Sequence, residues 1–355
     1  MKEVQLNPKV FAKMKKLQYL DIYGKGSSCD ILRSRGGLYL PQGLESLPNE
    51  LRYLRWAHFP LESLPSDFSG EKLVLLDLQD SQVRELWHED HKLQSLPELP
   101  SSLIALDASG CLSLENVTFP STAIQMLKEN KTRVAFWNCL KLNEHSLKAV
   151  EINAQINMMK FAHQHIPMSH SHPYDAKGTF VYPGSSVPKW LVYRTTHDYM
   201  TIDLPFANHS SQLGFIFCFI VPPVPSQGFI LRFNISVDEG DDSQLHLDRP
   251  SHEIKSDHVY LVYDRGFSHY LNSRVKDQPK FKIKITAESR TLTSEYVSLK
   301  MLRGFGVSPI NTSQYLNFIQ HMEMAEGPSI PTSLWGVVNS LLVVLFCTGL
   351  FLKFV

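Results

Sequence analysis

Two stretches of this sequence carry residue types that bind metal ions. The tract HQHIPMSHSH holds four histidines, at positions 163, 165, 170 and 172, and imidazole is a common metal ligand. Pro167 interrupts the tract and no cysteine or ordered carboxylate accompanies it, which favours a mobile polar loop. The acidic stretch Asp238–Asp248 offers oxygen ligands for calcium, but it lacks the spacing and closing glutamate of an EF-hand loop. We expect a solvated loop there and no metal site in either stretch.

The sequence also lacks the common patterns for nucleophilic or phosphate chemistry. It contains no GxSxG, no HExxH and no GxxxxGK[ST], and the glycines of Gly24–Asp30 do not have the spacing of a phosphate loop. Five scattered cysteines without a CxxC pair favour a reducing compartment. Lys plus Arg equals Asp plus Glu, at 35 each, so no net charge points to nucleic acid. We expect no enzyme, no cofactor and no small-molecule substrate.

The elements that position other residues begin with a repeat. The pattern LxxLxL occurs at Leu17-Leu20-Ile22, Leu51-Leu54-Trp56, Leu73-Leu76-Leu78 and, more weakly, Leu103-Leu106-Ala108. In such a repeat the leucines point inward from a short strand, and successive units stack to bury them. A recurring SLP marks each return segment, where proline disfavours a regular helix. The pattern predicts a repeat solenoid over residues 1–121.

The positions between these leucines point outward and are the candidate protein-binding surface. They are Tyr19, Asp21, Arg52, Tyr53, Arg55, Asp77, Gln79 and Asp107. Arg and Tyr are favoured anchors of protein interfaces, so this mixture predicts protein recognition. A plain solvated face is the alternative for any one of these residues.

After the repeats the pattern changes twice. Residues 122–175 predict a connector of loop and helix, the helix capped by Asn143. From about residue 176 to 310, eight short β-rich runs separated by turns predict a β-sandwich. GFIFCFIV is apolar on both faces and predicts a central strand. KFKIKIT alternates strictly, and its lysines predict an edge strand protected against further pairing.

The C-terminal end differs from the rest of the chain. Residues 333–355 are almost uncharged and long enough to cross a bilayer, with Trp335 at an interfacial position and only Lys353 charged. With residues 311–332 as a linker, this predicts a single-pass tail anchor that leaves the bulk of the chain in the cytoplasm. A helix packed on the protein or on a partner is the alternative, with the chain in the cytoplasm or nucleus.

Several motifs together resemble one known family. LPNELRYLRWAHFPLESLPSDFSGEKLVLLDLQDSQVRELW, LPELPSSLIALDASGCLSLENV, FWNCLKLNE and YPGSSVPKWLVYRTTHDYMTIDLP are similar, in that order, to the C-terminal part of plant TIR-type intracellular disease-resistance receptors. The resemblance implies leucine-rich repeats followed by a jelly-roll or immunoglobulin-like domain. The TIR and nucleotide-binding domains have no counterpart here, which suggests a truncated product, a fragment or an adapted remnant. Around Trp190 the chain has Lys189 and Leu191, where the family commonly has an acidic residue and phenylalanine.

The combined expectation for the fold is an α/β leucine-rich-repeat solenoid, an all-β jelly-roll/Ig-like sandwich and a C-terminal transmembrane helix. In the resembled family the repeats and the C-terminal domain bind pathogen effectors, so we expect a non-enzymatic recognition module of plant immunity. Its partner would be an effector or a partner immune receptor, bound by the outward repeat positions and the loop around Gly184–Trp190, including Lys189. The alternative is a membrane-tethered adaptor or decoy that recruits a host protein without sensing a pathogen.

Overall fold

The computed structural model describes 13 stretches of the 355-residue chain. They are residues 4–22, 38–84, 86, 99–120, 123–164, 177–204, 213–224, 230–238, 243–246, 253–275, 280–290, 296–299 and 303–325. Statements about structure below refer to these residues.

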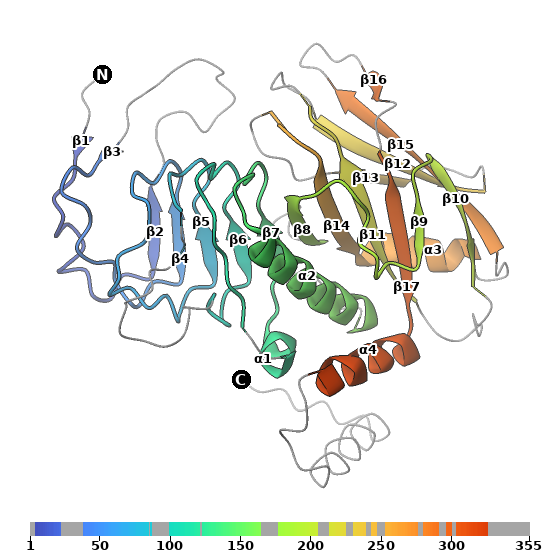
Figure 1. The fold of residues 1–355 in the computed structure, drawn as a ribbon, viewed down its shortest axis with the longest axis horizontal. Helices are drawn as coiled ribbons and strands as arrows, with labels where there is room; N and C mark the ends of the chain where they lie inside the picture. The colour runs from blue at the N-terminus through green and yellow to red at the C-terminus, as the bar shows by residue number, and fades with distance from the viewer. Residues whose placement is uncertain are drawn as a thin grey trace, which may run out of the picture.

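A ten-stranded sheet runs through most of the molecule (Figure 1). Its order is β2-β4-β5-β6-β7-β8-β14-β11-β17-β9. The strands are β2 (Tyr19–Ile22), β4 (Tyr53–Trp56), β5 (Leu75–Asp77), β6 (Ala105–Asp107), β7 (Arg133–Ala135), β8 (Lys177–Pro183), β14 (His258–Asp264), β11 (Gly214–Val221), β17 (Phe305–Ile310) and β9 (Tyr193–Thr195). Pairing is parallel from β2 to β8 and antiparallel from β8 to β9.

The repeated pattern sets the register of the parallel half. Leu20, Leu54, Leu76 and Leu106 are direct partners on neighbouring strands, so each copy of the repeat adds one strand in the same register. The last three of these leucines are at most 1% exposed, whereas Leu20 on the outermost strand is only partly buried. The same row continues into Val134 of β7 and Phe180 of β8. One hydrophobic core therefore runs beneath both halves of the sheet.

Helix α2 (Glu144–Gln164) covers that core on the antiparallel half. It packs against β8, β11, β14 and β17, and Asn143 caps its first turn by accepting a hydrogen bond from the Ser146 N–H at 2.8 Å. A Cβ atom on Gly214 would lie 2.1 Å from the Ala162 carbonyl oxygen, so glycine allows the helix to approach β11 closely. Helices α1 (Ala123–Lys128) and α4 (Thr312–Ala325) contact α2.

A second sheet covers the opposite face of the antiparallel half (Figure 1). Its strands, in the order β10-β15-β12-β13 with β16 paired to β15, are β10 (Tyr199–Asp203), β15 (Lys280–Arg290), β12 (Ile230–Val237), β13 (Ser243–His246) and β16 (Tyr296–Leu299). Helix α3 (Arg265–Val275) closes one side of this second core with Phe267 and Leu271. A separate two-stranded sheet pairs β1 (Val4–Gln5) with β3 (Leu38–Tyr39).

The turns that follow the parallel strands form a ladder. The residues His58, Asp80, Gly110 and Asn138 share a left-handed backbone, with φ of 60°, 57°, 76° and 59°. The N–H of Asp80 donates to the carbonyl oxygen of Ser109, and the N–H of Gly110 donates to the carbonyl oxygen of Trp137, each at 2.7 Å. Glycine suits the turn at position 110, because a Cβ there would lie 2.1 Å from Asp80 Oδ1 and the Asp80 side chain would have to move.

A histidine from the antiparallel half ends the ladder. The Asn138 N–H has no further coil to pair with, and it donates instead to His258 Nε2 at 2.9 Å. Nδ1 of His258 lies 2.8 Å from the Ser256 carbonyl, which requires a proton on Nδ1 and leaves Nε2 as the acceptor. The side-chain amide of Asn138 forms two further hydrogen bonds: its Nδ2 donates to the Glu253 carbonyl, and its Oδ1 accepts from the Lys255 N–H. These hydrogen bonds of Asn138 join the repeat strands to the rest of the sheet.

The predicted fold class is wrong. The structure is mostly sheet with few helices, and the repeat strands are part of the same sheet as the strands expected in a separate sandwich. Among the described residues, the return segments between β4, β5 and β6 contain no helix, so the α/β repeat solenoid is not observed. Prolines such as Pro65 and Pro100 lie in these segments, where their missing N–H and fixed φ disfavour a helix.

The predicted transmembrane helix is not supported either. Within the part of the chain that the structure describes, no helix combines the length and the apolar character needed to span a bilayer. Residues 333–355 themselves lie outside the described residues. Helix α4 occupies the first part of the segment 311–332 that was expected to be a linker.

Two strand predictions had opposite outcomes. GFIFCFIV is confirmed as a central strand, because β11 lies between β14 and β17 and is buried along its whole length. The edge position predicted for KFKIKIT is wrong, because β15 lies between β10 and β12. Its alternation instead reflects one face turned to the core through Phe281, Ile283 and Ile285.

Candidate protein-binding face

Most of the sequence-predicted site residues come together on one exposed face of the parallel half. Asp21, Arg55, Asp77 and Asp107 are direct partners on β2, β4, β5 and β6. They lie on the side of the sheet opposite the leucine core, because alternate residues of a strand point to opposite faces. We call this surface, together with Tyr19, Tyr53, Leu75, Gln79 and Arg133, the polar face; Arg52, which precedes β4, is exposed, but strand alternation does not assign it to this face.

A continuous network of charged and amide groups crosses the polar face. Arg55 Nη1 lies 3.5 Å from an Asp21 oxygen, and Arg55 Nε donates to Asp77 Oδ2 at 3.1 Å. Gln79 Nε2 lies 3.5 Å from Asp77 Oδ2 and 3.2 Å from Asp107 Oδ2. Each strand thus contributes one side chain that bonds to the next strand, which fixes the side-chain conformations along the row.

Arg133 completes this network, although the sequence pattern did not identify it. Its Nη2 donates to Asp107 Oδ2 at 2.8 Å from β7, a strand that lacks the LxxLxL pattern. The signal that would have revealed it is the register, which pairs Arg133 with Ala105 and so continues the outward row beyond the repeats. The polar face therefore extends across five strands.

Two tyrosines lie at the β2 end of the polar face. The rings of Tyr19 and Tyr53 are partners across the strand pair with centroids 5.9 Å apart, and they are 59% and 41% exposed. The Tyr19 hydroxyl donates to Asp21 at 3.1 Å, and this hydrogen bond raises the pKa of Tyr19 above its ordinary value. Large aromatic side chains left exposed in a fixed position are unusual in a structural surface and common in an interface.

The carboxylates of the polar face sit deeper than its arginines. The side chains of Asp21, Asp77 and Asp107 are 19%, 13% and 9% exposed, against 49% for Arg55 and 37% for Arg133. Burial, with a further contribution from nearby Asp107, raises the pKa of Asp77 above its ordinary value. The acidic groups form the floor of the face, and the guanidinium groups reach solvent.

Lys189 and its loop do not belong to the polar face. The loop around Gly184–Trp190 lies on the leucine side of the sheet, where Val187 lies over Gly306 of β17 and Trp190 packs against the core. Lys189 itself is exposed on that side. The expected single surface of repeats and loop is therefore split between opposite faces of one sheet.

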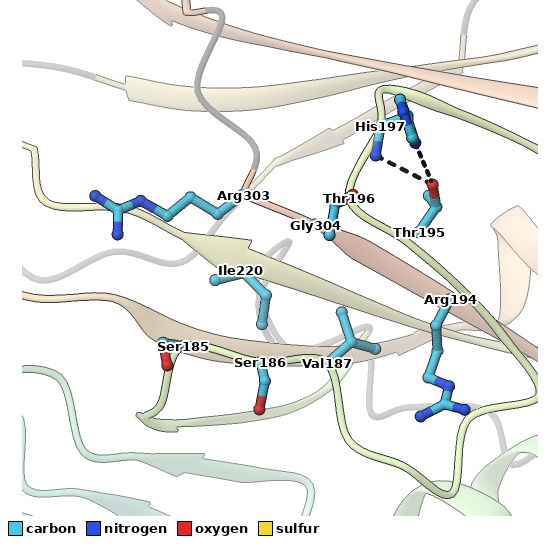
Figure 2. A pocket seen from close by; sticks show the side chains of 10 residues that line it. All are labelled: Ser185, Ser186, Val187, Arg194, Thr195, Thr196, His197, Ile220, Arg303 and Gly304. Atoms are coloured by element: carbon cyan, nitrogen blue, oxygen red, sulfur yellow. Dashed lines mark hydrogen bonds between the residues drawn. The ribbon is translucent and has the colours of Figure 1, made fainter.

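A cavity of about 480 Å³ lies beside that loop (Figure 2). Val187 and Ile220 line its middle, and Ser185, Ser186, Thr195 and Thr196 lie around it. In Figure 2 the side chains of Arg194 and Arg303 point in different directions, and Arg303 pairs with Asp257 at 2.8 Å. His197 is bonded to Thr195. The polar groups around the cavity do not converge on one point, whereas recognition of a small ligand requires that they do.

The stretches considered for metal binding can be located only in part. His163 stacks on Tyr315 with ring centroids 4.3 Å apart, and the other three histidines of the tract lie outside the described residues. In the acidic stretch, residues 243–246 form strand β13 instead of a loop, while 239–242 and 247–248 are outside the described residues. The described residues contain no cluster of three or more potential metal ligands.

Among the residues that the structure describes, no layer covers the polar face, which makes up one half of one face of the sheet and carries an ordered polar network. No protein-family model matches the chain. It is 38% identical over 121 residues to the disease resistance-like protein DSC1 of Arabidopsis thaliana, a match that covers 33% of this chain and 9% of that protein. It is 34% identical over 148 residues to the disease resistance protein RPV1 of Vitis rotundifolia, covering 33% and 11%.

A third relative gives the same result. The disease resistance protein TAO1 of Arabidopsis thaliana is 31% identical over 142 residues, which is 40% of this chain and 10% of that protein. The resemblance to plant TIR-type disease-resistance receptors is thereby confirmed for about a third of the chain. The chain spans about a tenth of the length of these curated relatives.

Proposed function

We propose that this chain is a non-enzymatic protein-recognition module of plant innate immunity, which binds a pathogen effector or a partner immune receptor through the polar face. The observation that carries the proposal is the ordered network of Asp21, Arg55, Asp77, Asp107 and Arg133 on a face that the second sheet does not cover. Similarity to disease-resistance proteins supports the setting in plant immunity.

The chemistry of the polar face suits a protein partner better than a small molecule. It is spread over five strands, with exposed tyrosine and arginine side chains, the residue types that most often dominate interface energies. The hydrogen bonds among its side chains hold them in place before binding, which lowers the entropy lost on association. We place this recognition in the cytoplasm, in keeping with the free, buried thiols of Cys111, Cys139 and Cys218.

Binding to co-expressed proteins in leaf tissue tests the proposal. The tagged chain is co-precipitated with a panel of candidate effectors and immune receptors, alongside the variants Tyr53→Ala and Arg55→Ala. Tyr199→Ala is the matched control, because Tyr199 is a similarly exposed strand tyrosine of the second sheet, 49% against 41%. We expect both polar-face variants to lose the partner and the control to retain it.

The identity of the captured protein separates two functions. Recovery of an effector or immune receptor that depends on Tyr53 and Arg55 supports the proposal. Recovery only of other host proteins, with the same dependence, favours an adaptor or decoy that recruits a host protein. Capture that is indifferent to both polar-face variants but lost in Tyr199→Ala contradicts the proposed surface.

A further inference from the structure

The groups of the polar face that reach solvent are not a balanced mixture of charges. The side chains of Arg55 and Arg133 are substantially exposed. The three carboxylates are recessed, and each lies within 3.5 Å of an arginine nitrogen. An approaching partner therefore meets guanidinium N–H groups first, although the three carboxylates of the polar face outnumber its two arginines.

The two paired arginines are positioned like receptors for carboxylates. Arg55 is held between Asp21 and Asp77, and Arg133 is held by Asp107, so neither guanidinium needs to be ordered on binding. A guanidinium presents five N–H donors in a planar fork that matches a carboxylate. Contacts of 3.1, 3.5, 3.2 and 2.8 Å link Arg55 Nε to Arg133 Nη2 through Asp77, Gln79 and Asp107, so the two guanidinium groups lie no more than about 13 Å apart although β5 and β6 separate their strands.

An apolar region lies beside the arginines. The rings of Tyr19 and Tyr53 occupy the β2 end, and the row of Tyr53 continues into Leu75 and Ala105, with Ile104 40% exposed beside it. The polar face thus has an apolar strip in one row and arginine tips at two places along its length. The order across the strands is aromatic pair, Arg55, then Arg133.

We propose that the partner segment is acidic: it places an apolar or aromatic side chain on the Tyr19–Tyr53 pair and carboxylates on Arg55 and Arg133. This inference rests on the proposed function and specifies the chemistry of the partner. An extended segment that runs across the strands advances about 3.3 Å per residue, so Asp or Glu residues up to four positions apart span the two arginines.

Synthetic peptides test this chemistry directly on the purified full-length chain. The probe is a fluorescent peptide with Phe at one end, followed by two Glu residues four positions apart. The comparison peptides carry Lys in place of both Glu, or the same two Glu in adjacent positions. We expect the spaced acidic peptide to bind at least tenfold more tightly than either comparison peptide, and its affinity to fall as salt is raised.

Variants assign the binding to the polar face. Arg55→Gln and Arg133→Gln should each weaken the acidic peptide about tenfold, as expected for loss of one charged hydrogen-bonding pair. Tyr53→Ala should weaken all peptides. Lys189→Gln, which removes an exposed charge from the opposite side of the sheet, should leave the affinity within twofold.

The outcomes distinguish this inference from the function on which it rests. Equal or preferential binding of the Lys peptide, still lost in Tyr53→Ala, overturns the acidic partner and leaves protein recognition by this face intact. Peptide binding that is indifferent to Tyr53, Arg55 and Arg133 overturns both. Peptides that fail to bind at millimolar concentration overturn the extended acidic segment, whereas the co-precipitation result on Tyr53→Ala and Arg55→Ala then decides the proposed function alone.

Discussion

One face of the ten-stranded sheet is charged over its parallel half and apolar over its antiparallel half. In a single register, Asp21, Arg55, Asp77 and Asp107 are followed by Ala135, Val181, Tyr260, Phe219 and Phe305. In this row the change occurs between Asp107 of β6 and Ala135 of β7, although Arg133 of β7 still belongs to the polar face, and from Ala135 onward the apolar side chains pack against the second sheet. On the reverse face both halves have the same apolar row.

The comparison separates what holds the molecule together from what is available to a partner. The reverse face is buried from β4 to β17, by the return segments in one half and by α2 in the other, and is less covered at the outer strands β2 and β9. The front face is buried only where the second sheet lies on it. A row of side chains that is polar and ordered, yet has no covering layer among the described elements, does not contribute a second core. It is therefore the place where we expect substitutions to affect binding more than stability.

The largest expected effect comes from placing a charged side chain in the apolar half of this face, compared with an apolar side chain in the charged half. Phe219→Asp places a charge at a fully buried position against the second sheet, and the expected loss is more than about 4 kcal/mol of unfolding free energy. The reciprocal change Arg55→Phe, at a side chain that is 49% exposed, should cost about 1 kcal/mol or less. Urea unfolding of both variants measures the difference, with Phe219→Leu as a control for volume. Similar losses in the two halves would refute the comparison.

The shared leucine row predicts a gradient within the parallel half. Leu76→Ala removes a side chain with no exposed surface and should cost about 3 kcal/mol, within the usual range for a buried leucine. Leu20→Ala, in the same row on the outer strand, should cost about 1 kcal/mol because that side chain is already partly exposed. Thermal and urea unfolding of the pair test this ratio, and an equal cost would mean that β2 is covered as well as β5.

The junction between the halves should respond to acid through His258. Burial lowers the pKa of His258 from 6.5 to about 4, because its Nε2 must stay unprotonated to accept the Asn138 N–H. Between those values the unfolded chain binds more protons than the folded one, so the stability contributed by His258 is full above pH 6.5 and falls as pH drops toward 4. The expected loss is about 3 kcal/mol.

His258→Gln provides the control for that pH dependence. Its amide oxygen can still accept the Asn138 N–H, but the side chain does not titrate. The difference between wild type and variant in unfolding free energy, measured from pH 7 to pH 4, isolates the histidine from the carboxylates that titrate in the same range. A constant difference across that range would show that His258 is not the group that couples the junction to pH.

The sequence pattern predicted the local geometry of the repeats better than their place in the fold. The spacing of Leu51, Leu54 and Trp56 identified the buried side of β4 and the exposed side that carries Arg55, because strand alternation is a local property. It could not show that Ala135 and Val181 continue the same row, since that pairing joins residues far apart in sequence. The predicted fold class did not include this pairing, which joins the repeat strands to the later strands in one sheet.

The candidate site shows the same limit. Asp21, Arg55, Asp77 and Asp107 were identified by repeat position, and the structure brings them together, whereas their role in binding remains a prediction. Arg133 was missed because β7 carries no repeat motif. Lys189 was predicted to share a surface with the outward repeat positions, but its loop lies on the opposite side of the sheet. A sequence motif identifies which types of residue occur at the outward positions. The order of the strands in the sheet determines on which face those residues lie and which residues neighbour them.

The smallest expected effect concerns the floor of the polar face. Because burial and Asp107 raise the pKa of Asp77, its charged form is less favourable in the folded protein than in water. Asp77→Asn should therefore leave the chain equally stable or up to about 1 kcal/mol more stable at pH 7, although Arg55 keeps only Asp21 as its partner. Urea unfolding at pH 7 measures this change, and a loss above about 1 kcal/mol would show that the network is structural.

The acidic peptide provides the second measurement on the same variant. If Asp77 holds Arg55 in position for a partner, Asp77→Asn should weaken binding of the spaced acidic peptide severalfold while stability is unchanged. Asp77→Ala is the comparison variant, because it also removes the acceptor of the Gln79 N–H and should lower both quantities. If the polar face is a recognition surface, the Asp77 charge should lower stability and improve binding. A purely structural ion-pair network would not give this combination.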